Sequence, residues 1–344
     1  MVRLNPGTIY FVRESDGPDK QFSNLVKIGL VEGDRSPFVR LREHQTGNPR
    51  RLKFDESQFV STDAVKYVES QLHRAFADRR VSGEWFKFET EQQLEDAVAL
   101  ARGLSAEMVE LSKVFEDAAK LEFRYSNGMN KPASDEEIHW GTQLARASVY
   151  VAQATDLIDN IRDSLKEVAI REGEEAVEGV LSKVVIEKEP AFSTSAFRDS
   201  NKENKKLHSE LSDVIPRWSA TFKLLIEIDS TDLDVVVTDQ LDELAVALDK
   251  AVKTHDVLAL NETELRAKQL SAPFEWEAAR SEALLMSSCG ECEGIENICT
   301  WSRKVVERKS FNPEKLRESY PDLYREYVLP REPEVKFIRL PFKN

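Results

Sequence analysis

Residues 7–29 read GTIYFVRESDGPDKQFSNLVKIG, two β-rich runs on either side of a turn-forming segment. The first run, residues 8–13, alternates and is rich in β-branched and aromatic side chains, and residues 24–28 have the same character. The intervening residues 14–23 contain Asp16-Gly17-Pro18-Asp19, which indicates a loop. The pattern predicts an antiparallel hairpin with an extended loop as the start of the fold.

A helix is expected directly after this hairpin. Ser36-Pro37 is typical of a helix start, with serine as the N-cap and proline at the first helical position. Arg40 and His44 follow four residues apart and therefore share one face of that helix. Gly47-Asn48-Pro49 ends the helix, and short strands are expected at residues 52–54 and 58–60.

A second helix is predicted, with Asp63 as a candidate cap. Its apolar stripe is formed by Val65, Val68, Leu72 and Phe76. Glu69 and His73, again four residues apart, lie beside this stripe, where they could face a cleft. Residues 85–88 are expected to close a small sheet flanked by helices.

The spaced motifs of this region resemble the GIY-YIG nuclease superfamily, in the branch of bacterial and phage proteins whose second motif reads VKIG. The resemblance covers about the first quarter of the chain. It depends on Gly7-Thr8-Ile9-Tyr10, Val26-Lys27-Ile28-Gly29, Arg40, His44, the loop Gln45-Thr46-Gly47-Asn48-Pro49, Glu69, His73 and Gly83-Glu84-Trp85-Phe86 in this order.

The resemblance implies a DNA endonuclease that hydrolyses phosphodiester bonds with Mg²⁺, or Mn²⁺ as a substitute, in phage defence or mobile-element biology. Glu69 matches the metal-binding glutamate, and one carboxylate suits Mg²⁺ because this ion keeps most of its waters. Arg40 matches the arginine that neutralises phosphate charge. Tyr10 matches the base or water-orienting tyrosine, and Lys27, which replaces the second tyrosine, would lower its pKa. His44 is the rival base.

DNA contacts are expected from a cluster of cations within an otherwise acidic protein. The net charge is −14, but residues 1–100 carry 15 Lys and Arg against 16 Asp and Glu, while the remainder carries 33 against 46. A local basic surface can hold phosphates on an acidic molecule. The candidate DNA-binding residues are Arg42, Arg50, Arg51, Lys53 and His73.

Two alternatives stay open at this point. Residues 45–49 could touch DNA or form only a tight turn. A non-catalytic DNA-binding or partner-binding protein that retains a nuclease fold is the other function considered.

Composition and hydropathy bound the class of protein. Hydrophobic residues make up 41% and charged residues 32%, as expected for a helix-rich globular protein. We expect a cytoplasmic location, because the sequence contains no apolar run of the roughly 18 residues that span a membrane. Cys289-x-x-Cys292 is read as ordinary thiols, with a zinc site as the alternative.

Beyond Thr90 the chain is predicted to be mainly helical. Apolar residues repeat in heptads, which indicates long helices packed as hairpins or coiled coils. The residues are Leu104, Met108, Leu111, Phe115 and Ala118; then Leu144, Ala147, Val151, Ala154, Ile158, Ile161, Leu165 and Val168; then Val237, Leu241, Leu244, Leu248 and Ala251. An intramolecular core is the preferred interpretation, with a homo-oligomer through one seam as the alternative.

The C-terminal part contains an internal repeat. Residues 191–200 resemble residues 310–319, with Phe192 on Phe311, and the match continues to Phe222 on Phe337. Each copy is predicted to be a strand, a short helix and a strand preceded by long helices. The second copy also resembles the tail of YqaJ-type phage exonucleases, at Gly294-Ile295, Thr300-Trp301, Phe311, Pro321-Asp322-Leu323-Tyr324, Tyr327 and Phe337.

The sequence thus predicts an α+β protein of three domains. Residues 1–90 would be the nuclease-like domain with a small mixed sheet, and residues 91–225 and 226–344 would be helical units that each carry one repeat.

Overall fold

A computed structural model describes residues 4–15, 22–46, 48, 50–171 and 181–339. The protein is 56% helical and 24% strand, with an N-terminal antiparallel sheet followed by helices, and this confirms the α+β prediction. Among the described helices, none is both long enough and apolar enough to cross a membrane.

The N-terminal hairpin forms as predicted and is the centre of a six-stranded sheet. Tyr10 on β1 lies opposite Gly29 on β2 in antiparallel register. Residues 16–21 of the expected loop lie outside the described residues. The strand order is β3-β1-β2-β6-β5, and β4 pairs with the other end of β1. The strands are β1 (Gly7–Ser15), β2 (Phe22–Glu32), β3 (Arg51–Phe54), β4 (Val60–Thr62), β5 (Arg80–Ser82) and β6 (Trp85–Lys87).

Both faces of this sheet are covered, because side chains alternate along each strand. Ile9 and Phe11 point to one face and pack against α2 (Val65–Ala75) and α3 (Glu91–Leu121). Tyr10 and Val12 point to the other face, toward Leu41 of α1 (Pro37–Thr46). The hydroxyl of Ser36 accepts a hydrogen bond at the start of α1, as predicted. The expectation for α2 was wrong, since its N-cap is Ala64 and has no side-chain cap.

The core of the N-terminal part continues past the expected boundary at Thr90. Leu94 and Met108 of α3 are buried in the same cluster as the strand residues, together with Trp276 of α8 (Val257–Cys289). The N-terminal sheet is therefore packed onto the helices, and the packing does not separate it as a unit of residues 1–90.

Long antiparallel helices form the body of the molecule, as the heptads predicted. They are α4 (Asp135–Arg171), α7 (Val235–Thr254) and α8. The predicted capping box at the start of α4 is present, because Ser134 and Glu137 exchange backbone-to-side-chain hydrogen bonds of 2.8 and 3.3 Å. The seam residues Ile161 and Leu248 are buried against Leu260 of α8. The seams thus pack within one chain, and a homo-oligomer stays a prediction.

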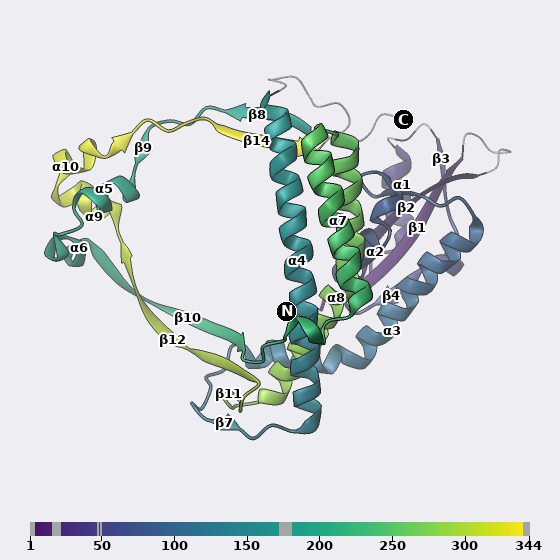
Figure 1. Ribbon diagram of the computed structural model, residues 1–344, viewed down its shortest axis with the longest axis horizontal. Coiled ribbons are helices and arrows are strands. Elements are labelled where there is room, and N and C mark those ends of the chain that lie inside the picture. Colours follow the sequence, from purple (N-terminus) through teal and green to yellow (C-terminus); the bar gives the residue numbers. More distant parts are fainter. Residues whose placement is uncertain (1–3, 16–21, 47, 49, 172–180, 340–344) are drawn as a thin grey trace.

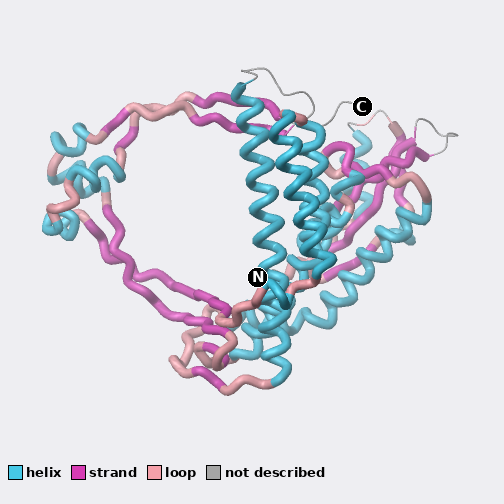
Figure 2. The backbone as a smooth tube through the Cα atoms, viewed as in Figure 1, coloured by secondary structure: helices cyan, strands magenta, loops and turns pink. Residues whose placement is uncertain are grey.

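Two long β-ribbons leave this body and meet at a small helical tip, so that the chain closes a ring (Figures 1 and 2). One ribbon pairs β10 (Ser212–Leu224) with β12 (Cys299–Phe311). The other pairs β8 (Leu181–Ile186) with β14 (Glu334–Arg339). The tip contains β9 (Ala191–Phe192), α5 (Thr194–Ser200), α6 (Lys205–Glu210), α9 (Pro313–Ser319), α10 (Pro321–Glu326) and β13 (Val328–Leu329). At the foot, β12 pairs with β11 (Gly294–Ile295), which pairs with β7 (Asn130–Lys131).

The internal repeat generates a two-fold pseudosymmetric tip. Phe192 pairs with Val328, and its counterpart Phe311 pairs with Ser212, at the position that the repeat relates to Val328. The Phe192 and Phe311 rings stack with centroids 5.9 Å apart. These two residues therefore occupy equivalent environments, as predicted.

The repeat does not form two separate units, however. The incoming strand of each copy pairs with the outgoing strand of the other copy, β8 with β14 and β12 with β10. The two units expected at residues 91–225 and 226–344 are thus not separate, because their strands pair with each other and form one ring. Phe222 and Phe337 lie on equivalent outgoing strands, but the side chain of Phe337 lies outside the described part of the chain.

Candidate functional site

The site is built around the hydroxyl of Tyr10, which the sheet holds in a buried position. Tyr10 is only 1% exposed, because its ring lies over Gly29 on the neighbouring strand. A Cβ at position 29 would approach the Tyr10 hydroxyl to 2.6 Å, so a larger residue would displace the ring. This close approach favours glycine at position 29, opposite Tyr10.

Helix α1 brings Arg40 and His44 to this hydroxyl. The Tyr10 oxygen lies 3.1 Å from Nε2 of His44. The Arg40 guanidinium also hydrogen-bonds to the Tyr10 side chain, and it donates to Glu43 at 3.0 Å. The two residues reach one phenol because they are one helical turn apart. Tyr10 can therefore accept a hydrogen bond from Arg40 and donate one to His44.

The protonation states favour this direction of donation. Burial lowers the pKa of His44, and the nearby positive charges of Lys27 and Arg40 lower it further, so His44 is neutral at pH 7. Burial raises the pKa of Tyr10 to about 12, although Arg40 acts in the opposite direction. Tyr10 thus keeps its proton near neutral pH, and a neutral His44 can accept a hydrogen bond from the Tyr10 hydroxyl.

Lys27 does not have the position that we expected. Its Nζ lies 2.8 Å from a carboxylate oxygen of Glu84, and the hydroxyl of Tyr10 interacts with Arg40 instead. The expectation that Lys27 favours a Tyr10 phenolate is therefore corrected. Lys27 faces the same side of the sheet as Tyr10, since Val12 is its register partner.

Glu84 is a site residue that the sequence reasoning did not select. Burial raises its pKa, but the hydrogen bond from Lys27 and the charge of Lys27 outweigh burial, and the net pKa is lowered. Glu84 is therefore ionised at neutral pH and acts electrostatically on Tyr10, His44 and Glu69. The signal was available, because Glu84 belongs to the Gly-Glu-Trp-Phe motif before the closing strand.

Glu69 lies on α2 and feels the same charges. Burial raises its pKa to about 7, the negative charge of Glu84 adds to this rise, and Lys27 and Arg80 oppose it. A divalent cation would favour the ionised form of such a carboxylate. The oxygen donors of Glu69 and Glu84 suit Mg²⁺, which is bound by one or two carboxylates and several waters. Among the described residues there is no cluster of three or more metal-binding side chains, so these donors would leave most of the coordination to water and substrate.

The predicted DNA-binding cations divide between the two faces of the sheet. Arg42 is exposed on α1, on the same helix as Arg40. Arg50 binds Glu14 at 2.6 Å, and Glu14 points to the same face as Tyr10. Arg51 and Lys53 are register partners of Ser15 and Arg13, so they point to the opposite face. The grouping of all these cations around one site is therefore corrected by the alternation of the strand.

Two other predicted contacts have structural roles. Nε2 of His73 lies 3.0 Å from the carbonyl oxygen of Ile28, and the centroid of the His73 ring lies 5.1 Å from that of Phe86. Nε2 is therefore used for a contact within the protein. The side chain of Gln45 donates to two backbone carbonyls and accepts from the amide of Leu52 at 2.8 Å. The turn interpretation is thus favoured for Gln45, while Gly47 and Pro49 lie outside the described residues.

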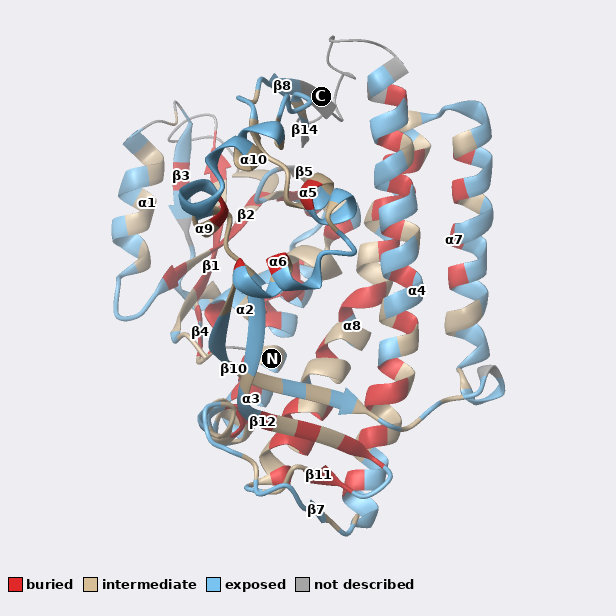
Figure 3. Cartoon of the chain, turned by 90° about the vertical axis from the view of Figure 1, so that its left-hand side faces the viewer, coloured by how far each residue is buried: buried red, intermediate tan, exposed pale blue. Residues whose placement is uncertain are grey.

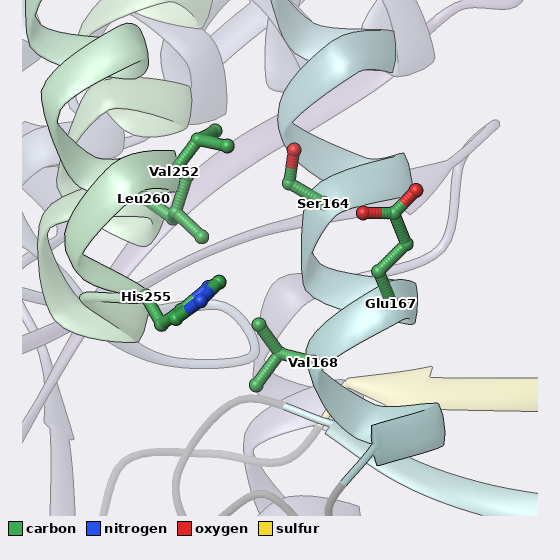
Figure 4. A pocket seen from close by; sticks show the side chains of 6 residues that line it. All are labelled: Ser164, Glu167, Val168, Val252, His255 and Leu260. Atoms are coloured by element: carbon green, nitrogen blue, oxygen red, sulfur yellow. The ribbon is translucent and has the colours of Figure 1, made fainter.

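A pocket elsewhere in the molecule does not coincide with this site. It has a volume of about 200 Å³ and lies between α4 and the turn that joins α7 to α8 (Figure 4). His255 at this turn has a left-handed backbone with a φ of 54°. The lining residues are Ser164, Glu167, Val168, Val252, His255 and Leu260, and none of them belongs to the N-terminal site.

Comparison with known proteins identifies a nuclease-type segment at the N-terminus, while membership of the GIY-YIG superfamily stays a prediction. Residues 7–102 match the T5orf172 domain, a GIY-YIG-like, nuclease-associated domain. The match extends into α3, in agreement with the shared core. No curated protein and no solved structure matches the chain. The resemblance of the C-terminal tail to YqaJ-type exonucleases lies outside the matched residues and stays a prediction.

Proposed function

We propose that this protein is a Mg²⁺-dependent DNA endonuclease whose active site lies between α1 and the N-terminal sheet. The observation that carries the proposal is the buried Tyr10 hydroxyl, which interacts with both Arg40 and the Nε2 atom of His44. This arrangement occurs inside a nuclease-type segment. Hydrolysis of a phosphodiester needs an oriented water, a proton acceptor and positive charge at the phosphate.

In this proposal Tyr10 and His44 act together, so that both candidate bases have a role. A water held by the Tyr10 oxygen attacks phosphorus and gives its proton to that oxygen, while the Tyr10 proton passes to neutral His44. The bond from phosphorus to the leaving oxygen breaks, and the leaving oxygen takes a proton from solvent. Because the pKa of Tyr10 is about 12, the phenol would relay a proton and would not store negative charge before the reaction.

Arg40 supplies fixed positive charge in the same proposal. Its planar guanidinium suits a phosphate, and 41% of its side chain is exposed, so substrate can reach it. Glu69, with Glu84 nearby, would hold Mg²⁺ or Mn²⁺. When bound, the cation would neutralise charge on the phosphate oxygens and the leaving oxygen. Lys27 would keep Glu84 ionised and oriented through their 2.8 Å ion pair.

A plasmid-nicking assay tests this proposal. The full chain should nick supercoiled DNA in Mg²⁺ and leave it intact in EDTA. His44→Gln should reduce the rate by roughly 10²- to 10⁴-fold, the usual contribution of a general base. Lys53→Gln is a matched control, because Lys53 points to the opposite face of the sheet, and it should cleave at the wild-type rate.

A second candidate function is a DNA-binding protein without catalysis. The pKa of about 7 for Glu69 favours it, because such a carboxyl carries a proton part of the time near neutral pH. In that case neither wild type nor any variant would nick DNA in Mg²⁺ or Mn²⁺, while gel-shift affinity would persist. Nicking that needs the cation and is lost with His44→Gln would exclude this candidate.

A further inference from the structure

The ribbon of β10 and β12 has one face that is rich in cations and hydroxyl groups. Directly paired residues of an antiparallel ribbon point to the same side. The register pairs Lys223 with Thr300, Thr221 with Ser302, Ser219 with Lys304, Arg217 with Val306, and Ile215 with Arg308. This set of ten residues is called the cationic face below. It contains four cations and four hydroxyl groups, of which the Ser302 oxygen is buried, and the 3.1 Å distance between the hydroxyls of Ser219 and Thr221 agrees with their position on one side.

The opposite face of the ribbon serves the protein core. At the foot of the ribbon it carries Trp301, which is 1% exposed and packs with Phe222 against the ends of the long helices. Figure 3 shows that the buried part of β12 lies near these helices, while β10 beside it consists of half-buried and exposed residues. At the foot of the ribbon only the cationic face therefore remains for a ligand, whereas further out both faces are exposed.

The four cations of this face are exposed and electrostatically available. They are Arg217, Lys223, Lys304 and Arg308. Within the residues that the structure describes, none of the four forms an ion pair. Asp213, the acidic residue further along the same side, is bound to Lys315 and accepts a 2.7 Å hydrogen bond from Asn312. Its charge is therefore already compensated.

The ring carries positive charge away from an acidic body. Residues 181–224 and 299–339 hold 18 Lys and Arg against 13 Asp and Glu, whereas residues 101–180 and 225–298 hold 14 against 33. The 13 residues of β10 extend about 40 Å. Because charges are screened over about 8 Å at physiological salt, the outer part of the ribbon is largely independent of the acidic helices.

We infer that the cationic face binds the phosphate backbone of duplex DNA, as a second contact surface beyond the nuclease-like site. Arg and Lys supply the charge and Ser and Thr hydroxyls supply additional donors, the groups that dominate phosphate contacts in protein–DNA complexes. A two-stranded β-ribbon also fits the major groove of B-form DNA. The inference shares with the proposed function only the choice of DNA as ligand.

The experiment measures binding without cleavage. Fluorescence anisotropy of a labelled duplex of about 30 base pairs is followed in EDTA from 50 to 200 mM salt, with the full chain. Each phosphate contact contributes about 0.9 to the slope of log affinity against log salt. Arg308→Ala should lower this slope by about 0.9, and joint replacement of the four cations by alanine should lower it by about 3 to 4. Lys309→Ala is the matched control, because Lys309 is the next residue of β12 and points to the opposite side.

The outcomes separate this inference from its rivals. The inference is overturned if the salt slope is unchanged in both Arg308→Ala and the variant with all four cations replaced. It is also overturned if Lys309→Ala loses as much slope as Arg308→Ala. The inference is also overturned if the alanine variants lose slope in binding to duplex RNA but not in binding to duplex DNA. Circular dichroism shows whether the variant with all four cations replaced is folded. If that variant is unfolded, the result for Arg308→Ala alone decides. If the wild type nicks DNA and the alanine variants bind it with an unchanged salt slope, the inference alone is refuted. If the wild type does not nick DNA in Mg²⁺ but the alanine variants show the expected loss of slope, the proposed function alone is refuted.

Discussion

Glu69→Gln should stabilise the metal-free protein at pH 8 while it abolishes cleavage. Glutamine has nearly the same shape as glutamate but carries no charge. The pKa of Glu69 rises from an ordinary value near 4.5 to about 7, because burial and the charge of Glu84 disfavour the ionised form. Ionisation of this carboxyl in the folded state therefore lowers the free energy of unfolding of the wild type. The variant has no charge at this position and keeps its full stability.

The size of the effect follows from the difference in proton affinity. A tenfold change in proton affinity corresponds to about 1.4 kcal/mol, so a rise from 4.5 to about 7 sets a ceiling of roughly 3 kcal/mol. Solvent screens part of this cost because Glu69 is not fully buried, and we expect about 1 to 2 kcal/mol.

The pH dependence gives the sign. Glu69 loses its proton near pH 4.5 in the unfolded chain but near pH 7 in the folded protein, so the wild type loses stability as pH rises through this interval. Urea unfolding in EDTA should give nearly equal free energies of unfolding for both proteins about one pH unit below the unfolded-state pKa of 4.5. At pH 8 the variant should be more stable by about 1 to 2 kcal/mol.

Glu84→Gln is the matched control, with the opposite sign expected. The net pKa of Glu84 is lowered, so its ionised form is favoured in the folded state, and the variant should be less stable than the wild type at pH 8. Millimolar Mg²⁺ should also stabilise the wild type and remove the advantage of Glu69→Gln, because a bound ion stabilises only the folded state. Plasmid cleavage by Glu69→Gln should fall by roughly 10³-fold or more.

Two results would refute this reasoning. A Glu69→Gln variant no more stable than wild type at pH 8 would mean that the ionised carboxylate is not disfavoured. Equal cleavage by both proteins in Mg²⁺ would mean that Glu69 does not hold the cation.

Three further predictions follow from the packing. Lys27→Met should move the rising limb of the pH–rate profile to higher pH, because the charge of Lys27 lowers the pKa of both His44 and Glu69. Gly29→Ala should destabilise the protein by about 1 to 3 kcal/mol in urea unfolding, since its Cβ would lie 2.6 Å from the Tyr10 ring. A fragment of residues 1–121 should melt at a higher temperature than one of residues 1–100, because the shorter one ends inside α3.

Each of these has its own control. Lys53→Met should leave the pH–rate profile unchanged, and a shift there would point to long-range charge effects. Gly103→Ala meets no atoms within 4 Å and lies inside α3, so it should stabilise by about 0.5 to 1 kcal/mol, in contrast to Gly29→Ala. Equal melting temperatures of the two fragments would show that the second half of α3 adds nothing to the N-terminal core.

Local patterns in the sequence determined most of the secondary structure. The hairpin of residues 7–29, the Ser36 cap, the Ser134–Glu137 capping box and the heptad seams were all predictable, because each depends on residues two to seven positions apart. The repeat also identified Phe192 and Phe311 as equivalent. The motif spacing indicated Tyr10, Arg40 and His44, which meet at one hydroxyl in the structure.

Only the tertiary structure decided which of these parts meet. The path of the chain places Glu84 against Lys27, packs Trp276 of α8 into the N-terminal core, and pairs each repeat strand with the other copy. Burial then determines the chemistry, since the same glutamate that titrates near 4.5 in water titrates near 7 at position 69. Neither strand pairing between residues 75 to 158 positions apart nor desolvation is encoded in a local pattern, because both depend on what the rest of the chain places beside each side chain.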